Sequence, residues 1–420
     1  MLRFILADLR RLWAGALVMV LLVALAVALG VGITLQERAL RLGSARASDA
    51  FDLVIGAPGS ETQLALSTVF LQPAALPLVD GHVFEDLSAD PRVTWVAPVG
   101  FGDFYRDYPL VGTTSTLIAQ FAPGLAEGRV FTTQGEAVIG ARVALKPGDS
   151  LIPSHGAAAQ GGTDHHEVAY RVTGRMAPTG TAWDRAILVP IRSVWAVHGM
   201  AGGPDDDHDH DHDHEHGHGH GHEAPHFDPD AAVSEVWSGG ETPGLPALLV
   251  KPASLADAYK LRQDYRSRPD TLAVFPAEVL TGLYGLMGDA RQVLAAVALG
   301  AQALVAVALV MVTVIHIGQR RRQVAALRAF GAPRGAIFSL VWAEMLALLG
   351  MGILLGYVLG WGAAVQLSRW LSARQGFDLP VEWAAGDGRA LALLAGVAIV
   401  LAALPALIAY RQPVVAHLRG

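Results

Sequence analysis

The sequence predicts an α-helical membrane protein with four transmembrane helices in a 1+3 arrangement and a large α+β domain between the first and second helices. Three observations support this. Four segments are apolar over roughly 20 residues or more, the length that crosses a bilayer. Residues 36–290, between the first two of them, have the mixed polarity of a soluble domain. The mean hydropathy is +0.38 in spite of that insertion.

The four apolar segments are residues 12–35, 293–318, 336–362 and 390–410. The first could instead be a cleaved signal peptide, because Arg3, Arg10 and Arg11 precede it. The hydrophobic part of a signal peptide, however, is only about 7–15 residues long. We therefore expect an uncleaved membrane anchor.

Arginines that flank the apolar segments predict the orientation, since cytoplasmic loops carry an excess of positive charge. Three arginines precede residue 12, five lie in 319–335 and two follow residue 410. The loop 363–389 has three arginines balanced by three acidic residues. We therefore expect 1–11, 319–335 and 411–420 to be cytoplasmic, and the 36–290 domain and the 363–389 loop to lie on the outer side.

The 36–290 domain must have an ordinary hydrophobic core, because the chain contains no cysteine and hence no disulfide framework. A helix should begin at Ser254, a plausible N-cap, and end before Pro269. A further helix should run from Pro276 into the second apolar segment as a stalk. Apolar runs next to Gly/Pro turns predict strands within 51–60, 92–100, 108–114, 136–144, 167–176, 185–191 and 247–254.

Residues 204–226 read PDDDHDHDHDHEHGHGHGHEAPH and contain nine of the 16 histidines. Such a segment cannot bury apolar surface, so we expect a disordered loop. Imidazole and carboxylate suit Zn²⁺, with Cu²⁺ and Ni²⁺ close behind, which predicts a flexible metal scavenger or sensor. The alternative is an acidic, solvating loop that binds metal only incidentally. The candidate ligands are His208, His210, His212, His214, His216, His218, His220 and His222.

A second polar cluster contains His155, His165, His166 and Glu167, around a Gly-rich stretch. It lacks the HExxH spacing of helical zinc sites. Two interpretations remain open: a polar loop with incidental histidines, or a lumen-facing or metal-assisting site.

Small residues in the third apolar segment predict close helix packing. Gly352, Gly356 and Gly360 are spaced four residues apart, which lets a second helix approach. The partner could be a helix of the same chain or of a second copy. Glu344 is a carboxylate well inside this segment, and it could have a functional role or could snorkel or pair with an arginine.

Residues 319–332 read QRRRQVAALRAFGA, a basic cluster followed by an apolar-periodic helix that ends at a glycine. A mere membrane anchor would not need that helix, so we expect it to contact a partner. It resembles the connector that couples permease subunits of the MacB/FtsX-type ABC-transporter family to their separate ATPase. The corresponding residues are Arg320, Arg321, Arg322, Gln323, Leu327, Arg328, Phe330 and Gly331.

The resemblance extends over most of the chain. FDLVIGAPGSETQLALSTVF (51–70), VGTTSTLIAQF (111–121), LAEGRVF (125–131), EAVIGARVA (136–144), APTGTAWDRAILVPI (177–191) and the closing PALIAYRQPVVAHLRG resemble a bacterial subgroup of these permeases. One departure is Gln323, where the family commonly has glutamate. An amide can hydrogen-bond there but cannot form a charged pair with an ATPase arginine.

The resemblance implies a bacterial inner-membrane permease with a MacB-like periplasmic domain. Two permease chains would pair, two cytoplasmic ATPase subunits would dock beneath them, and ATP-driven closure would pass up the stalk helices to the periplasmic domains. The sequence has no GxxxxGK[ST], so we expect no ATPase activity in this chain. Lipidic, lipoprotein or peptide substrates are implied. We expect no intrinsic cofactor and no nucleic-acid partner, and a periplasmic substrate-binding or zinc-binding protein is a possible partner.

Other functions stay open. The histidine tract could serve zinc transport or sensing, although a metal channel should carry several ligands inside its spans and here only Glu344 and His316 qualify. An FtsX-like regulator of cell-envelope hydrolases is a further alternative. A membrane-anchored metallohydrolase is disfavoured because no ordered ligand motif is visible.

Overall fold

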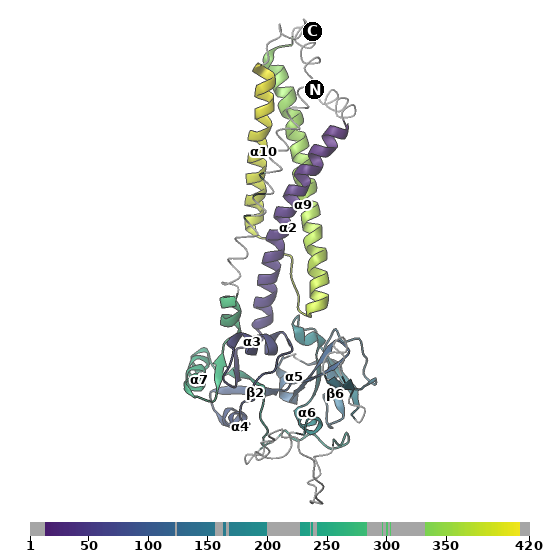
Figure 1. The fold of residues 1–420 in the computed structure, drawn as a ribbon, viewed down its shortest axis with the longest axis vertical. Coiled ribbons are helices and arrows are strands. Elements are labelled where there is room, and N and C mark those ends of the chain that lie inside the picture. The colour runs from purple at the N-terminus through teal and green to yellow at the C-terminus, as the bar shows by residue number, and fades with distance from the viewer. Residues whose placement is uncertain are drawn as a thin grey trace, which may run out of the picture. The chain divides into compact units, whose positions relative to one another are not determined.

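The structure is a computed structural model of the whole chain. It describes residues 13–121, 124–155, 163–164, 168–199, 227–235, 237, 242–283, 296, 300, 303 and 332–411. The chain divides into two compact units (Figure 1). The helical unit comprises Met1–Arg41, Leu286–Trp370 and Pro380–Gly420, and the outer unit comprises Leu42–Gly285 and Leu371–Leu379.

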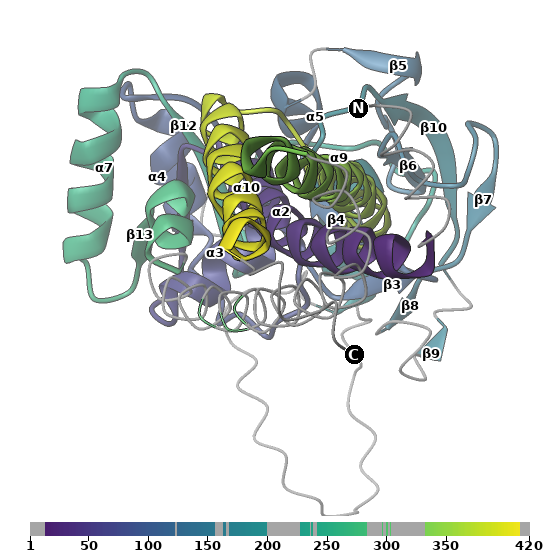
Figure 2. The ribbon, with the colours of Figure 1, turned by 90° about the horizontal axis from the view of Figure 1, so that it is seen from above.

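Three long helices make up the described part of the helical unit: α2 (Trp13–Ser48), α9 (Arg334–Gln375) and α10 (Ala385–Arg411). Each contains a window long and apolar enough to cross a membrane. Figure 2 looks along them. Met19, Val23, Met345, Leu348 and Ala402 belong to one buried cluster to which all three helices contribute.

All three helices are longer than their apolar segments, α2 and α9 by the most. Helix α2 continues 13 residues past Leu35, and α9 continues to Gln375. The added residues include many strong helix formers such as Gln, Glu, Arg, Leu and Ala, which prolong a helix after hydropathy has fallen. The link between α9 and α10 is therefore shorter than the 363–389 loop that hydropathy predicts. Apart from residues 296, 300 and 303, the second apolar segment lies outside the described residues, as does the 319–331 connector.

The outer unit contains a four-stranded antiparallel sheet in the order β13-β1-β12-β2. The strands are β1 (Leu53–Gly56), β2 (Val93–Val99), β12 (Ala247–Pro252) and β13 (Leu272–Val274). Helices α3 (Glu61–Val69), α4 (His82–Ala89) and α7 (Leu255–Ser267) contact it. Ser254 caps α7, its side chain accepting a hydrogen bond from the Asp257 amide, as its sequence position predicts.

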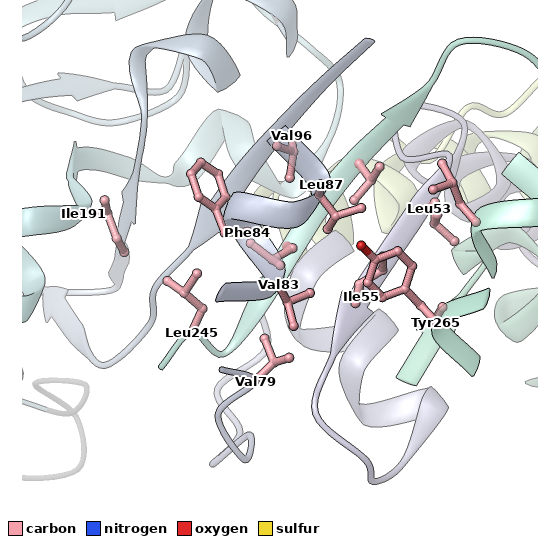
Figure 3. Packing of buried hydrophobic residues seen from close by; sticks show 14 of the residues in the cluster. Leu53, Ile55, Val79, Val83, Phe84, Leu87, Val96, Ile191, Leu245 and Tyr265 are labelled. Carbon is pink, nitrogen blue, oxygen red and sulfur yellow. The ribbon is translucent and has the colours of Figure 1, made fainter. Parts of the chain in front are cut away.

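The core of this sheet is formed by aliphatic and aromatic side chains from strands and helices together. Ile55 from β1 and Val83 and Leu87 from α4 are fully buried in one cluster (Figure 3). Leu261 from α7 belongs to the same cluster. On α4 the two positions are four residues apart and share one helix face, so burial of that face holds the helix on the sheet. Each such side chain contributes about 1.5–3 kcal/mol of hydrophobic free energy.

The second sheet is mixed and nine-stranded, in the order β5-β10-β6-β11-β4-β3-β8-β9, with β7 paired to β10. The pairs β10/β6 and β11/β4 are parallel. Its strands are β3 (Asp103–Tyr105), β4 (Tyr108–Thr113), β5 (Leu125–Gly128), β6 (Glu136–Ile139), β7 (Ser150–Leu151), β8 (Ser154–His155), β9 (Thr163–Asp164), β10 (Tyr170–Met176) and β11 (Ile187–Pro190). Short helices α5 (Ser115–Phe121), η2 (Ala182–Arg185) and α6 (Ile191–Val197) complete the unit.

Two glycines allow α6 to pack closely at the junction of the two sheets. Gly100 and Gly112 exchange backbone hydrogen bonds of 2.8 and 3.0 Å. A Cβ on Gly112 would lie 2.6 Å from a methyl of Val194, and one on Gly100 would lie 2.6 Å from Ile191 Cδ1. Any larger residue would displace α6, so these glycines fix the position of its first half, where Ile191 and Val194 lie.

The end of α9 is held inside the outer unit. Arg142 pairs with Asp378, and the Asp378 amide donates to the Gly180 carbonyl at 3.1 Å. The Phe70 and Phe377 rings meet edge-on with centroids 5.0 Å apart. Residues 371–379 are therefore integrated in this unit by polar and aromatic contacts.

Candidate functional site

Most residues that the sequence singles out for partner or metal binding lie outside the described residues. This holds for the connector residues Arg320 to Gly331, the tract histidines His208 to His222, and His165, His166 and Glu167. His155 is described, as are the three glycines of α9 and Glu344.

His155 belongs to a cluster that brings together three distant parts of the chain. It ends β8, and the pairing of β3 with β8 places it opposite Asp103. His198 directly follows α6, whose position is fixed by the glycine pair described above. Among the described residues, Asp103, His155 and His198 form one group that could hold a metal ion, with their ligand atoms all within 4.8 Å of one another.

The geometry of this histidine cluster centres on one carboxylate. His155 Nδ1 lies 3.3 Å from Asp103 Oδ1, and His198 Nε2 lies 3.2 Å from Asp103 Oδ2. The two imidazole rings are 5.5 Å apart and inclined at 59°. The side chain of Asp103 is 5% exposed, that of His198 20% and that of His155 61%. The site thus has a buried carboxylate, Asp103, and a solvent-exposed imidazole, His155.

Electrostatics at the cluster favour positive charge. The hydrogen bond to Asp103 raises the pKa of His198 above its ordinary value, against the opposing effect of burial. Burial raises the pKa of Tyr170, and the negative charge of Asp103 adds to that shift. The negative charge of the Asp103 carboxylate therefore acts on Tyr170. A cation placed between the two imidazoles would be stabilised by that charge.

Sequence reasoning identified only His155 of these three residues. It grouped His155 with His165 and His166 because they are neighbours in the chain. Asp103 and His198 become neighbours of His155 through strand pairing and helix packing, and no spacing rule connects residues 103, 155 and 198. The available signal was local: Asp103 interrupts a run that otherwise reads as apolar and aromatic.

In the helical unit, the three glycines of α9 face α2 of the same chain. A Cβ on Gly352 would lie 2.6 Å from Val23 Cβ, one on Gly356 2.5 Å from the Ala24 carbonyl oxygen, and one on Gly360 2.7 Å from the Ala28 carbonyl oxygen. The backbones of the two helices are therefore in direct contact along two turns. Small residues at this spacing permit such an approach.

An ion pair joins α2 to the first turn of α10. Arg38 donates two hydrogen bonds of 2.7 Å to Asp387, one to each oxygen. The two side chains are 15% and 10% exposed. Asp387 also accepts from the Ala384 amide at 2.9 Å, so it stabilises the start of α10 as well.

Glu344 on α9 is 1% exposed and is thus a fully buried carboxylate.

These observations define a membrane protein that combines a packed helical unit with a separate α+β unit. Residues 295–414 match the family model described as FtsX-like permease C-terminal. This part of the chain, which includes the whole of α9 and α10, is therefore an FtsX-like permease domain, and the resemblance stated from the sequence is confirmed for it.

Two solved structures are also similar to the chain. One is the periplasmic region of MacB from Actinobacillus actinomycetemcomitans, at 11% identity and a TM-score of 0.32, covering 56% of this chain and 95% of that one. The other is the extracellular domain of the noncanonic ABC-type transporter YknZ from Gram-positive bacteria, at 12% identity and a TM-score of 0.28, covering 53% and 98%. The comparison with curated proteins gives no match.

Proposed function

We propose that this chain is the permease subunit of an ABC transporter of the mechanotransmission or export type, driven by a separate cytoplasmic ATPase. The observation that carries the proposal is the FtsX-like permease match over residues 295–414. That range includes the basic connector 319–335, which we assign to ATPase docking. The sequence has no phosphate-binding GxxxxGK[ST] loop, which accords with hydrolysis in a partner.

The coupling would run through helices that belong to both units. Helix α2 begins in the helical unit and its last residues belong to the outer unit, and α9 does the same. In our proposal, ATP-driven closure of two ATPase subunits moves a pair of permease chains, and the continuous helices pass that motion to the outer unit. The chain would lie in the bacterial inner membrane with both termini cytoplasmic and the outer unit in the periplasm.

The test is to co-express the chain with its cognate ATPase and purify the complex in nanodiscs. We expect the permease alone to hydrolyse no ATP, the pair to co-purify, and the complex to hydrolyse ATP. A complex whose ATPase lacks the phosphate-loop lysine should assemble without turnover and serves as the control. Failure of the two chains to associate under conditions where both are folded would contradict the proposal.

A zinc link is a second proposal, supported by the alternating Asp-His tract at residues 204–226. Such a repeat offers many overlapping ligand sets, so the full chain should bind more than one Zn²⁺ and release protons on binding. Removing residues 205–222 should abolish most of this capacity, as measured by calorimetry. An unchanged zinc stoichiometry in the deletion variant would exclude the tract as the ligand source.

A further inference from the structure

We propose that Asp103, His155 and His198 form an ordered binding site for a single divalent transition-metal ion, Zn²⁺ foremost, separate from the histidine tract. The donor set is two imidazoles and one carboxylate. Three protein ligands of this kind with a remaining open position are the arrangement in which Zn²⁺ keeps a water or an exchangeable ligand. The inference concerns the outer unit alone and does not depend on the proposed ATPase coupling.

The distances between the donor atoms fit one metal ion. Zn²⁺ binds nitrogen and oxygen at about 2.0–2.1 Å in tetrahedral geometry, so two of its ligand atoms lie about 3.3 Å apart. His155 Nδ1 lies 3.3 Å from Oδ1 of Asp103 and His198 Nε2 lies 3.2 Å from Oδ2, and the ligand atoms of the three residues all lie within 4.8 Å of one another. Charge-assisted N–H···O bonds are typically shorter, about 2.7–2.9 Å. The spacing is thus closer to that of ligands around an ion than to that of tight His-carboxylate pairs.

The three ligands differ in burial, so one side of the site is fixed by the fold and the other is open to solvent. Asp103 is nearly inaccessible, at 5%, while the His155 side chain is 61% exposed. A metal ion could therefore enter from the solvent side at His155 and meet a carboxylate that the fold already holds in place. Gly102 lies beside His198, since a Cβ there would come within 3.4 Å of its Nε2. The lack of a side chain at Gly102 leaves room at that imidazole nitrogen.

The described residues on either side of the histidine tract belong to this site or lie near it. His198 precedes the tract by only six residues, and Phe227 directly follows it. The Phe227 ring packs edge-on against Tyr170 at 5.7 Å, and Tyr170 is the residue that feels the charge of Asp103. The candidate site and the tract are thus close in the sequence, so binding at the site is measured with the tract removed.

The experiment removes the tract so that only the ordered site remains. The full chain lacking residues 205–222 is dialysed against Zn²⁺ and its metal content is measured, followed by calorimetric titration. We expect about one Zn²⁺ per chain. His155→Ala or His198→Ala in this background should weaken binding by at least about 100-fold, because even residues that only orient metal ligands cost roughly 10–100-fold.

A matched control comes from another histidine of the same unit. His82 pairs with Asp80 at 2.7 Å on the surface, so it reproduces a simple His-carboxylate contact. His82→Ala should leave the single zinc equivalent and its affinity unchanged. Thermal unfolding of each apo variant identifies any that fail to fold.

Spectroscopy separates an ordered site from loose binding. Co²⁺ substituted into the tract-deleted chain should give the intense visible bands of a four-coordinate ion, and His198→Ala should remove them. If the tract-deleted chain retains no zinc, or if folded His155→Ala and His198→Ala variants bind as the parent does, the site does not exist. Loss of zinc binding in the His82→Ala variant would equally overturn the assignment.

Discussion

At the scale of single residues, the ion pair of Arg129 and Glu136 shows how one carboxylate organises a loop. Glu136 begins β6 and accepts from Arg129 Nη1 at 2.8 Å and from the Thr132 amide at 2.7 Å. The Arg129 guanidinium, with these amides, holds the pKa of Glu136 well below its ordinary value, at about 2. The carboxylate is largely buried, with its side chain 13% exposed, while Arg129 is 55% exposed.

This pair predicts part of the acid sensitivity of the outer unit. A carboxyl whose pKa is lower in the folded than in the unfolded state stabilises the fold above its unfolded pKa, and that stability is lost as the pH falls toward about 2. We expect Glu136→Gln to lower the free energy of unfolding at pH 7 by about 1–2 kcal/mol, the exposure of Arg129 keeping the value small. Below about pH 2, where Glu136 is protonated in the folded state as well, the variant and the parent should converge.

The measurement is chemical unfolding of the full chain at a series of pH values. Glu127→Gln is the control, because Glu127 is an exposed glutamate of strand β5, which precedes β6 in the chain. An equal effect of both substitutions at pH 7 would show that the Arg129 pair contributes nothing.

Residue-level prediction from sequence succeeded where the signal is local. The N-cap role of Ser254 follows from its position before a polar helix, and the structure has it. It failed for Asp103 and His198, because their environment is produced by long-range pairing. Asp103 lies in a short strand, and nothing in the sequence around it indicates that two imidazoles contact its side chain.

At the scale of elements, the contact of α9 with α2 depends on the absence of side chains at three positions. We expect Gly356→Leu to destabilise the helical unit by about 2 kcal/mol or more, since its Cβ alone would lie 2.5 Å from the Ala24 carbonyl oxygen. Gly350→Leu is the matched control on the same helix, because no described atom lies within 4 Å of a Cβ there. Unfolding by SDS titration in mixed micelles compares the two variants.

Two outcomes would contradict this interpretation of the glycines. One is a Gly356→Leu chain as stable as the parent. The other is a chain that keeps its stability as a monomer but no longer dimerises, since the glycines would then serve a second copy rather than α2.

The ion pair between α2 and α10 predicts a second element-scale effect. Removing one partner of a pair this buried leaves an uncompensated charge, so Arg38→Ala should cost about 2–4 kcal/mol. Arg41→Ala is the control, because Arg41 contacts Glu37 only at 4.0 Å and is 61% exposed. The double substitution Arg38→Met and Asp387→Leu should recover much of the loss. Thermal unfolding in detergent is the measurement, and equal losses for Arg38→Ala and Arg41→Ala would refute the role of the pair.

Sequence patterns predicted the presence of helices and strands better than the residues at which these elements end. The expected strand segments correspond to β1, β2, β4, β6, β10, β11 and β12, because apolar runs between turn residues report strand burial directly. Helix α9 extends beyond its apolar part because hydropathy marks the membrane core and not the last helical residue. Two-residue strands such as β8, which carries His155, are too short to leave a pattern.

At the scale of the whole molecule, the connector provides the sharpest test of ATPase docking. Replacing Arg328 and Phe330 with Asp should weaken association with the ATPase about tenfold or more, because an arginine and an aromatic residue are typical interface anchors. Gln323→Glu restores the charge common in related connectors and should bind at least as tightly as the parent. Co-purification of equal amounts of membrane-inserted permease measures both.

Undiminished recovery of the ATPase with the double variant would show that docking occurs elsewhere.

The architecture of the whole chain was predictable in outline from its composition, which shows apolar segments, an insertion of mixed polarity and a basic connector. The pairing of nine strands into one mixed sheet was not, because the parallel pairs β10/β6 and β11/β4 join segments with no common local signal.

The way in which residues 371–379 are held has a mechanical consequence. This segment consists of the last residues of α9 and the four residues that follow the helix. It contacts Arg142, the Gly180 carbonyl and the Phe70 ring. Arg142 also approaches Asp184, which is 1% exposed and accepts hydrogen bonds from Thr179. Within the outer unit, any movement of residues 371–379 would therefore act first on the loop around η2 and on the residues that follow β6.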